Sequence, residues 1–339
     1  METASSPPEW LVDVLERERK VLGCPGLVAG FFDAGNKPQI ASVGIARVGS
    51  ERPLHATDAL HLGSCTKALT ALLIGDAISA GQLRFTTTLG ALSPVWKKSP
   101  WADCTVDDVL RHEAGLPENA LWWGLAGTGL DVTSQRRDVL NTKWLTGSKR
   151  TTRGKYAYSN VGYVVLGSVI DTVYGMPYED VVQLRIARPN FLQTPGFGVP
   201  DKVYGHQLTP AGYLPTTLDN PPVMNSAGRL HMSMGDWLQT ASLHTDSSRF
   251  LSQDVRKQLQ VSPVDGGYAG GWIVTKRSWA GGPALTHAGS NTFWFAVMWI
   301  APNTGRAFAA VANAAGAEVS NGLDRIIGAM TLKAGSTSR

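Results

Sequence analysis

Both ends of this 339-residue chain carry the same pattern, a helix next to a pair of strands. Apolar residues at helical spacing predict one helix at each end, over residues 9–22 and 317–332. Apolar runs bounded by turn residues predict four strands, over residues 26–32, 39–46, 294–300 and 307–312. Two hairpins that are each flanked by a helix can join into a single sheet with helices packed on it. The pattern therefore predicts an α+β fold whose antiparallel sheet is built from both chain ends.

The middle of the chain is mostly helical and loop-like, with its clearest apolar stripe over residues 159–174. A length of 339 residues and a hydrophobic content of 43% allow about two domains. We therefore predict an α/β sheet domain formed by residues 9–63 and 241–333 together, and an inserted, mainly helical domain of residues 64–240.

The segment Ser64-Cys65-Thr66-Lys67 is the only Ser-x-x-Lys in the chain, and an apolar run follows it. Residues three apart lie on one face of a helix, so the Ser64 hydroxyl and the Lys67 amine are expected to be neighbours. An unprotonated amine can take the hydroxyl proton and make the serine a nucleophile. The alternative is structural: Ser64 caps the helix, and Lys67 is a solvated side chain in its first turn.

The only Tyr-x-Asn in the chain, Tyr158-Ser159-Asn160, stands where the helix of the middle region begins. A phenol held near an ammonium can lose its proton well below its usual pKa of about 10, so Tyr158 is a candidate proton relay. The Asn160 amide can donate to a substrate carbonyl and accept from Lys67. The alternative is that Ser159 caps the helix and Tyr158 packs against the core.

A third polar cluster, His287-Ala288-Gly289-Ser290, precedes the strand predicted at the C-terminal end. Gly289 lets a substrate approach the backbone closely. The Ser290 N–H can then join the Ser64 N–H as a two-donor oxyanion hole. A lone histidine beside a strand is more often a hydrogen-bonded structural residue, and this alternative stays open for His287.

These three clusters, in this order, resemble the motifs of the serine β-lactamase-like superfamily of class C β-lactamases, DD-peptidases and family VIII-type esterases. Its motifs are Ser-x-x-Lys, Tyr-x-Asn and either Lys-Thr-Gly or His-x-Gly. Residues 109–117 and 226–230 are similar to further family segments, so the resemblance runs from about residue 10 to 330. It implies a β-lactamase/transpeptidase-like fold with the active site between the sheet and the helical domain.

The resemblance implies acyl transfer through an acyl-enzyme at Ser64, with Lys67 and Tyr158 acting together as base and then as acid. Asn160 would position Lys67 and the substrate, and His287 would orient the substrate or assist Tyr158. Which of Lys67 and Tyr158 holds the proton is a property of the coupled pair.

The substrate class follows from one departure from the family pattern. His287 stands where class C β-lactamases carry a lysine, whose fixed charge suits a substrate carboxylate, and a histidine is mostly neutral at pH 7. We therefore expect a carboxylesterase on small or medium acyl esters. A β-lactamase, a D-amino-acid peptidase or amidase, a transesterase and a non-catalytic sensor of the same fold are the alternatives. Arg229 and Cys65 also depart from the pattern, and the sequence assigns no role to either.

Tryptophan is abundant, with 11 residues. Trp122, Trp272 and Trp294 fall near segments that should border the cleft, and we expect them to form part of its wall. Aromatic side chains of this kind are more often core residues, which is the alternative.

Composition excludes several other classes. A net charge of +4 with scattered basic residues argues against a nucleic-acid partner, and no stretch of about 20 apolar residues predicts a membrane span. The N-terminal residues do not resemble a secretory signal, and three widely separated cysteines fit a reducing compartment, so we expect a cytoplasmic protein unless a signal was removed. The sequence shows no spacing typical of a metal site, a dinucleotide or a Walker motif, so no metal or cofactor is expected beside the small-molecule substrate. The oligomeric state is left open.

Overall fold

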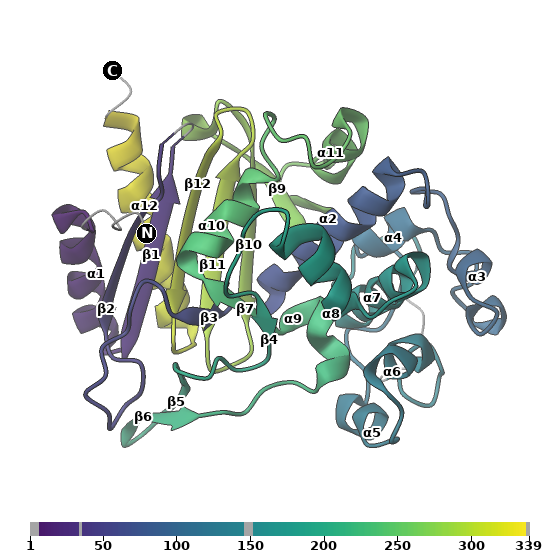
Figure 1. Ribbon diagram of the computed structural model, residues 1–339, viewed down its shortest axis with the longest axis horizontal. Coiled ribbons are helices and arrows are strands. Elements are labelled where there is room, and N and C mark those ends of the chain that lie inside the picture. The colour runs from purple at the N-terminus through teal and green to yellow at the C-terminus, as the bar shows by residue number, and fades with distance from the viewer. Residues whose placement is uncertain (1–6, 34–35, 146–151, 337–339) are drawn as a thin grey trace.

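The main sheet joins the two ends of the chain. The computed structural model describes residues 7–33, 36–145 and 152–336. Seven antiparallel strands follow the order β2-β1-β12-β11-β10-β9-β8, with N-terminal β1 paired to C-terminal β12 (Figure 1). Their bounds are Gly26–Phe32 (β1), Gln39–Gly44 (β2), Gly267–Ala269 (β8), Trp272–Arg277 (β9), Gly282–Ser290 (β10), Phe295–Ala301 (β11) and Arg306–Ala312 (β12). The predicted α+β fold with an antiparallel sheet built from both chain ends is confirmed.

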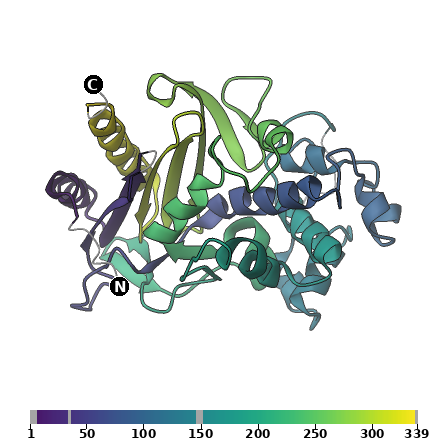
Figure 2. The same ribbon diagram turned by 45° about the horizontal axis from the view of Figure 1, so that its top comes forward.

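Helices cover both faces of this sheet. Helices α1 (Glu9–Leu22) and α12 (Ala317–Ser336) pack on one face, while α2 (Thr66–Ser79) and α10 (Met234–Ser242) lie on the other (Figure 2). Side chains of a strand alternate between its faces. In β1, Leu27 accordingly belongs to the apolar cluster under α1 and α12, and Val28 to the larger cluster on the side of α2.

The remaining helices are short, apart from α7, and most of them gather beside the sheet. They are α3 (Leu89–Leu92), α4 (Val106–Leu110), α5 (Trp122–Ala126), α6 (Val132–Asp138), α7 (Asn160–Tyr174), α8 (Tyr178–Val181), α9 (Asn225–Gly228) and α11 (Gln253–Leu259). A small sheet has the order β3-β7-β4, with bounds Ala59–His61 (β3), Gly196–Phe197 (β4) and Leu230–Ser233 (β7). A separate hairpin pairs β5 (Gly205–Thr209) with β6 (Gly212–Thr216).

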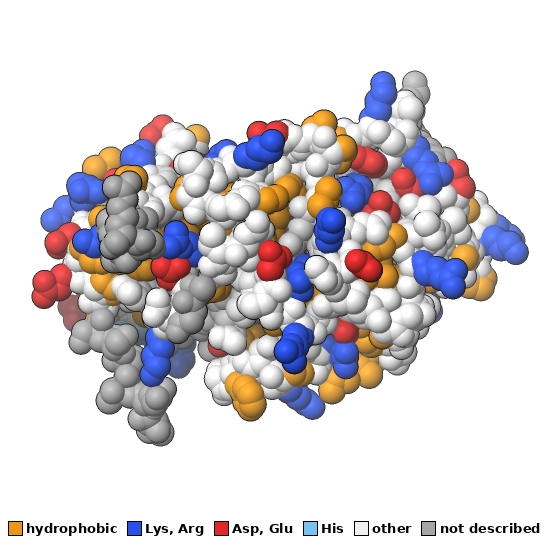
Figure 3. Space-filling model, turned by 90° about the horizontal axis from the view of Figure 1, so that it is seen from above, with side chains coloured by type: hydrophobic (Ala, Val, Ile, Leu, Met, Phe, Trp, Pro, Cys, Tyr) orange, Lys and Arg blue, Asp and Glu red, His pale blue; other side chains and the backbone are white. Residues whose placement is uncertain are grey.

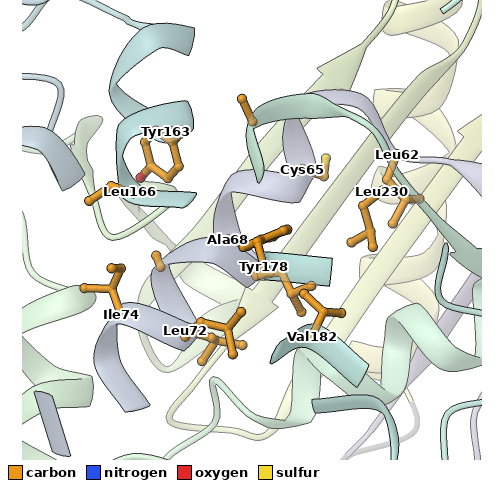
Figure 4. Packing of buried hydrophobic residues seen from close by; sticks show 14 of the residues in the cluster. Leu62, Cys65, Ala68, Leu72, Ile74, Tyr163, Leu166, Tyr178, Val182 and Leu230 are labelled. Carbon is orange, nitrogen blue, oxygen red and sulfur yellow. The ribbon is translucent and has the colours of Figure 1, made fainter. Parts of the chain in front are cut away.

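Helix α2 runs through the middle of the molecule and is apolar on every side. Its residues from Thr66 to Ala77 are all buried. Figure 4 shows Ala68, Leu72 and Ile74 of this helix packed among apolar side chains of neighbouring elements. A helix that is apolar all round is stable only inside a core. The burial of α2 carries its first turn, and with it the Lys67 amine, into the dry interior.

The division of the chain into residues 9–63 with 241–333 and residues 64–240 stays a prediction. The structure adds that α10 runs through its second boundary and packs against β1 and β12. Helix α10, most of which lies in the predicted helical domain, therefore also packs on the main sheet.

Charged side chains of both signs are interspersed over the face seen in Figure 3. Within residues 7–33, 36–145 and 152–336, no helix combines the length and the apolar character that crossing a lipid bilayer requires.

Candidate active site

Ser64 lies in a tight turn between a strand and the central helix. This turn, the 3₁₀ segment η1 (Gly63–Cys65), follows β3 and leads into α2. A Cβ atom on Gly63 would lie 2.4 Å from Ser290 N, and one on Gly289 would lie 2.6 Å from Ser64 N. No side chain fits between these two backbones, and Gly63 also has a φ of +51°, which favours glycine. The two N–H groups predicted for an oxyanion hole thus belong to segments in direct contact.

The three predicted motifs meet at the Ser64 hydroxyl. The Tyr158 hydroxyl donates to Ser64 Oγ at 2.9 Å, and Lys67 Nζ lies 3.1 Å from the same oxygen. Nζ also donates to Asn160 Oδ1 at 2.8 Å and to the Ala227 carbonyl at 2.7 Å. Residues from α2, α7, α9 and the turn before α7 therefore share one hydrogen-bonded centre.

The Lys67 amine is held in a form that can accept a proton. Its side chain is fully buried, and burial lowers its pKa from 10.5 to about 7. A neutral amine has two N–H donors and one lone pair. The two donors match Asn160 Oδ1 and the Ala227 carbonyl, so the lone pair is left for the Ser64 hydroxyl. With these contacts, a neutral Lys67 amine can accept the Ser64 proton.

The surroundings of Tyr158 favour its protonated form. Burial raises the pKa of its phenol, although the hydrogen bond to Ser64 acts in the other direction. Burial thus opposes the expected loss of the phenol proton below pH 10, and the hydrogen bond to Ser64 does not offset it. Tyr158 is a protonated hydroxyl that donates to the nucleophile.

The helix cap expected from the structural interpretation of the Tyr-x-Asn motif is present. Ser159 caps α7 by accepting from Gly162 N at 3.0 Å, and its hydroxyl donates to the Pro117 carbonyl. Asn160, the first residue of the helix, donates from Nδ2 to Asn119 Oδ1 at 2.9 Å. The cap and the helix start thus place Tyr158 next to Ser64 Oγ and Asn160 next to Lys67 Nζ.

His287 is a buried residue of β10 with both ring nitrogens engaged. Nδ1 lies 2.6 Å from the Ala288 carbonyl, which only accepts, so Nδ1 carries the hydrogen. Nε2 therefore accepts from the Tyr268 hydroxyl, 3.1 Å away. Burial and the nearby Lys67 lower the pKa of His287 to about 3. His287 is thus a neutral ring that faces Tyr268, and its expected role in orienting the substrate or assisting Tyr158 stays a prediction.

Cys65 packs behind the nucleophile. Its thiol is buried, donates to the His287 carbonyl at 3.4 Å, and has its pKa raised by burial. A protonated thiol in this position joins η1 to β10 and is a poor nucleophile.

Ser64 opens into a cleft of about 500 Å³. Its walls are formed by Ser64, Asn119, Trp122, Trp123, Asn160, Leu218, Asp219, Asn220, Met224, Gly228, Ser290, Asn291, Thr292 and Phe293. Among the described residues of this lining, Asp219 is the only charged side chain, and it is already paired with Arg229 at 3.1 Å. The cleft therefore presents apolar and neutral polar groups to a ligand.

Of the three tryptophans expected in the wall, the structure places only Trp122 there. Trp272 and Trp294 are 2% and 1% exposed and belong to the core, so their assignment to the wall is corrected. The Trp272 indole donates to His244 Nδ1, and Trp294 packs against Gly205, where a Cβ would lie 2.5 Å from its nitrogen.

Sequence reasoning missed most of the residues that line the cleft. Asn119, Asp219 and Asn291 come from loops, and no periodic pattern marks them. A usable signal was present only for Asn119, which follows the family-like segment 109–117 by two residues.

This chain resembles known proteins in both sequence and fold. A family model described as Beta-lactamase matches residues 12–330. The chain is 26% identical over 238 residues to the unguisins hydrolase ungD of Aspergillus violaceofuscus, covering 64% of this chain and 41% of that protein. It is 23% identical to penicillin-binding protein 4 of Amycolatopsis lactamdurans, covering 89% and 83% of the two chains.

Among solved structures, D-amino acid amidase of Ochrobactrum anthropi in complex with L-phenylalanine superposes with a TM-score of 0.79 and 18% identity. The match covers 95% of this chain and 98% of that one. The alignments with the first three curated relatives, in contrast, span only 41%, 36% and 37% of those proteins.

Proposed function

This chain belongs to the Beta-lactamase family, and from that premise we propose that it is a serine hydrolase, a carboxylesterase that cleaves small or medium acyl esters through an acyl-enzyme at Ser64. The proposal concerns a small-molecule substrate and needs no metal or cofactor, because the nucleophile, base and oxyanion donors are all groups of this chain.

One observation carries the choice of an uncharged ester: the cleft offers no cation for a substrate carboxylate. No Lys, Arg or His belongs to the described cleft lining. The residue at the family's Lys position, His287, is buried and neutral and has both ring nitrogens engaged. Burying a carboxylate without a cation is costly, whereas an ester carries no net charge. The apolar surfaces of Trp122, Met224 and Phe293 suit an acyl or aryl group.

Acylation begins with attack of Ser64 Oγ on the ester carbonyl carbon. The Oγ–C bond forms, the hydroxyl proton passes to the Lys67 amine, and the carbonyl electron pair moves onto oxygen. The backbone N–H groups of Ser64 and Ser290 stabilise that oxyanion. When the tetrahedral intermediate collapses, the C–O bond to the alcohol breaks. The leaving oxygen takes the proton from the Lys67 ammonium, with the Tyr158 hydroxyl beside Ser64 Oγ as relay.

Deacylation repeats these steps with water. Lys67, neutral again, takes a proton from a water molecule that attacks the acyl carbon. The bond to Ser64 Oγ breaks, and the serine recovers its proton from the Lys67 ammonium. The carboxylic acid leaves and the chain returns to its starting state. An alcohol in place of water would give transesterification by the same residues.

The test has two parts. A fluorophosphonate, followed by digestion, should label the peptide that contains Ser64, and Ser64→Ala should not label. Label on another residue in an active preparation contradicts the nucleophile assignment.

Specificity is measured on p-nitrophenyl esters of increasing chain length, on nitrocefin and on a D-alanine amide, with Ser64→Ala as blank. We expect the highest kcat/KM on an uncharged ester. A clear preference for nitrocefin would reject the charge argument and indicate a β-lactamase. A preference for the amide would indicate a D-amino-acid amidase. A folded protein that turns over none of them would support a non-catalytic role.

A further inference from the structure

The carboxylate of Asp219 lies between the two segments that supply the oxyanion donors. On one side, Asp219 Oδ2 is 3.1 Å from His61 Nε2, and His61 Nδ1 accepts from Gly63 N at 3.1 Å. On the other side, Asn291 Nδ2 donates to Asp219 Oδ1 at 3.0 Å. Gly63 directly precedes Ser64, and Asn291 directly follows Ser290. The carboxylate is therefore tied to the neighbour of each donor.

Every contact of this carboxylate comes from a donor. Besides His61 and Asn291, Arg229 Nε donates to Oδ2 at 3.1 Å and Asn220 N donates to Oδ1 at 2.8 Å. His61 is fully buried, and only 5% of the Asp219 side chain is exposed. Burial opposes the charge of Asp219, but its hydrogen bonds to His61 and Asn291 and the Arg229 guanidinium hold its pKa below the usual range. The group is a fixed anion with four donors aimed at it.

The tautomer of His61 follows from the same contacts. Because Nδ1 accepts the Gly63 N–H, it carries no hydrogen, and Nε2 is the donor to Asp219. The ring thus transmits the position of the carboxylate to the Gly63 backbone, which has a φ of +51°. Arg229 donates to the Asp219 carboxylate and also donates to Asn225 Oδ1. Arg229, to which the sequence assigned no role, thus fixes the position of the Asp219 carboxylate.

We propose that Asp219, with His61 and Arg229, is a positioning set that holds the backbone N–H groups of Ser64 and Ser290 in register for the oxyanion. This proposal rests on the proposed acyl transfer at Ser64. None of the three residues is assigned a proton transfer. Their effect is on geometry, and a misplacement of about 1 Å can cost roughly 10²-fold in rate.

Asp219→Asn is the diagnostic variant. An amide can accept through only one of its two ends, so its NH₂ group must face either His61 and Arg229 or Asn291 and Asn220. We expect kcat per active site to fall about 10- to 100-fold, with KM changed less than about threefold. Inhibition by a phenylboronic acid, whose Ser64 adduct is tetrahedral, should weaken by a similar factor. Active sites are counted by the end point of fluorophosphonate labelling.

Glu18→Gln is the matched control. Glu18 is an equally buried carboxylate, 8% exposed, and is paired with Arg325 at 2.8 Å between α1 and α12 on the far face of the sheet. It should lose stability without losing kcat per labelled site. Arg229→Lys, which keeps the charge, should recover most of the rate that Arg229→Met loses.

A readout independent of turnover separates this proposal from the proposed function. Hydrogen exchange of the Gly63 amide should be faster in Asp219→Asn than in the wild type and in Glu18→Gln. If the wild type neither labels nor turns over an ester, the proposed function fails, and the Gly63 exchange alone then supports or rejects the positioning set. Unchanged Gly63 exchange overturns the proposal, and so does a kcat per site equal to that of the wild type.

Discussion

Among the residues that the structure describes, two Lys or Arg side chains are fully buried, and their surroundings are opposite in kind. Arg136 of α6 makes four hydrogen bonds to Asp171 and Glu179, at 2.8 to 3.1 Å. Lys67 of α2 has a hydroxyl, an amide oxygen and a carbonyl as its hydrogen-bond partners. Both side chains are 0% exposed. Arg136 and Lys67 are therefore equally buried, and they differ in their hydrogen-bond partners.

The partners decide the protonation state. Burial alone would favour a neutral Arg136, yet its hydrogen bonds to Asp171 and Glu179 raise its pKa above the ordinary value. Lys67 makes no ion pair within the part of the chain that the structure describes, and its pKa falls to about 7. A buried cation with carboxylates stabilises a fold only as a pair, whereas a buried amine without them is a base at neutral pH.

The largest effect is expected from Lys67→Arg, which gives the site a cation that cannot lose its proton. Because general-base catalysis typically contributes 10² to 10⁴ in rate, we expect kcat/KM on an activated ester to fall by about that factor. Arg136→Lys, the reciprocal exchange, keeps a charged residue between two carboxylates and should leave kcat per labelled site unchanged. A Lys67→Arg enzyme with more than a tenth of wild-type activity would remove Lys67 as the base.

Arg136→Met tests the other half of the comparison through stability. Removing one partner of a buried ion pair leaves uncompensated charge and typically costs about 3–5 kcal/mol. We expect a loss of that size in the free energy of unfolding from urea titration. Arg19→Met, which breaks a partly exposed pair with Glu16, should change it by less than about 1 kcal/mol. Equal losses in the two variants would contradict the structural role of Arg136.

The pH dependence of kcat/KM should report the Lys67 amine. With a pKa of about 7, the amine is protonated and inactive as a base below that pH. The rate should therefore fall with a slope that approaches tenfold per pH unit well below pH 7, or about 50-fold between pH 7 and pH 5. Because burial raises the pKa of Tyr158, no loss from phenol ionisation is expected up to about pH 10. A flat profile from pH 5 to 8 would argue against an amine base.

Tyr268→Phe should have the smallest effect on kcat/KM. It extends the comparison from buried cations to a buried neutral ring, that of His287. The change removes the donor to His287 Nε2, and one lost buried hydrogen bond costs about 1–3 kcal/mol of stability. Since His287 is not in the cleft lining, kcat/KM should change less than about tenfold. A 100-fold loss, with normal folding by circular dichroism, would return His287 to a direct role in catalysis.

Local sequence was enough to predict the outer elements of the fold. The helix over residues 9–22 and the strand over 26–32 match α1 and β1, because alternation and helical spacing are local properties that burial on one side enforces. The strand predicted over 294–300 differs from β11 by one residue at each end. Strands β8 to β10 were not predicted, because glycines and polar residues interrupt their patterns.

The meeting of Ser64 with Lys67, Tyr158 and Asn160 could also be predicted, from helix spacing and from the order of the motifs. Their chemical states could not. The pKa of Lys67 depends on the burial of α2 among apolar side chains, and the neutrality of His287 on a tyrosine 19 residues away. Burial and long-range hydrogen bonds depend on residues that are far apart in the sequence. No local sequence pattern contains that information.

The amino-acid order thus determined which side chains carry reactive groups and which helices and strands hold them. Only the tertiary structure decided that Trp272 and Trp294 are core residues, that Tyr158 keeps its proton, and that Asp219 lies between the two backbone donors. The reason is physical: reactivity depends on the local dielectric and on which dipoles face a group, and the packing of segments distant in sequence sets both.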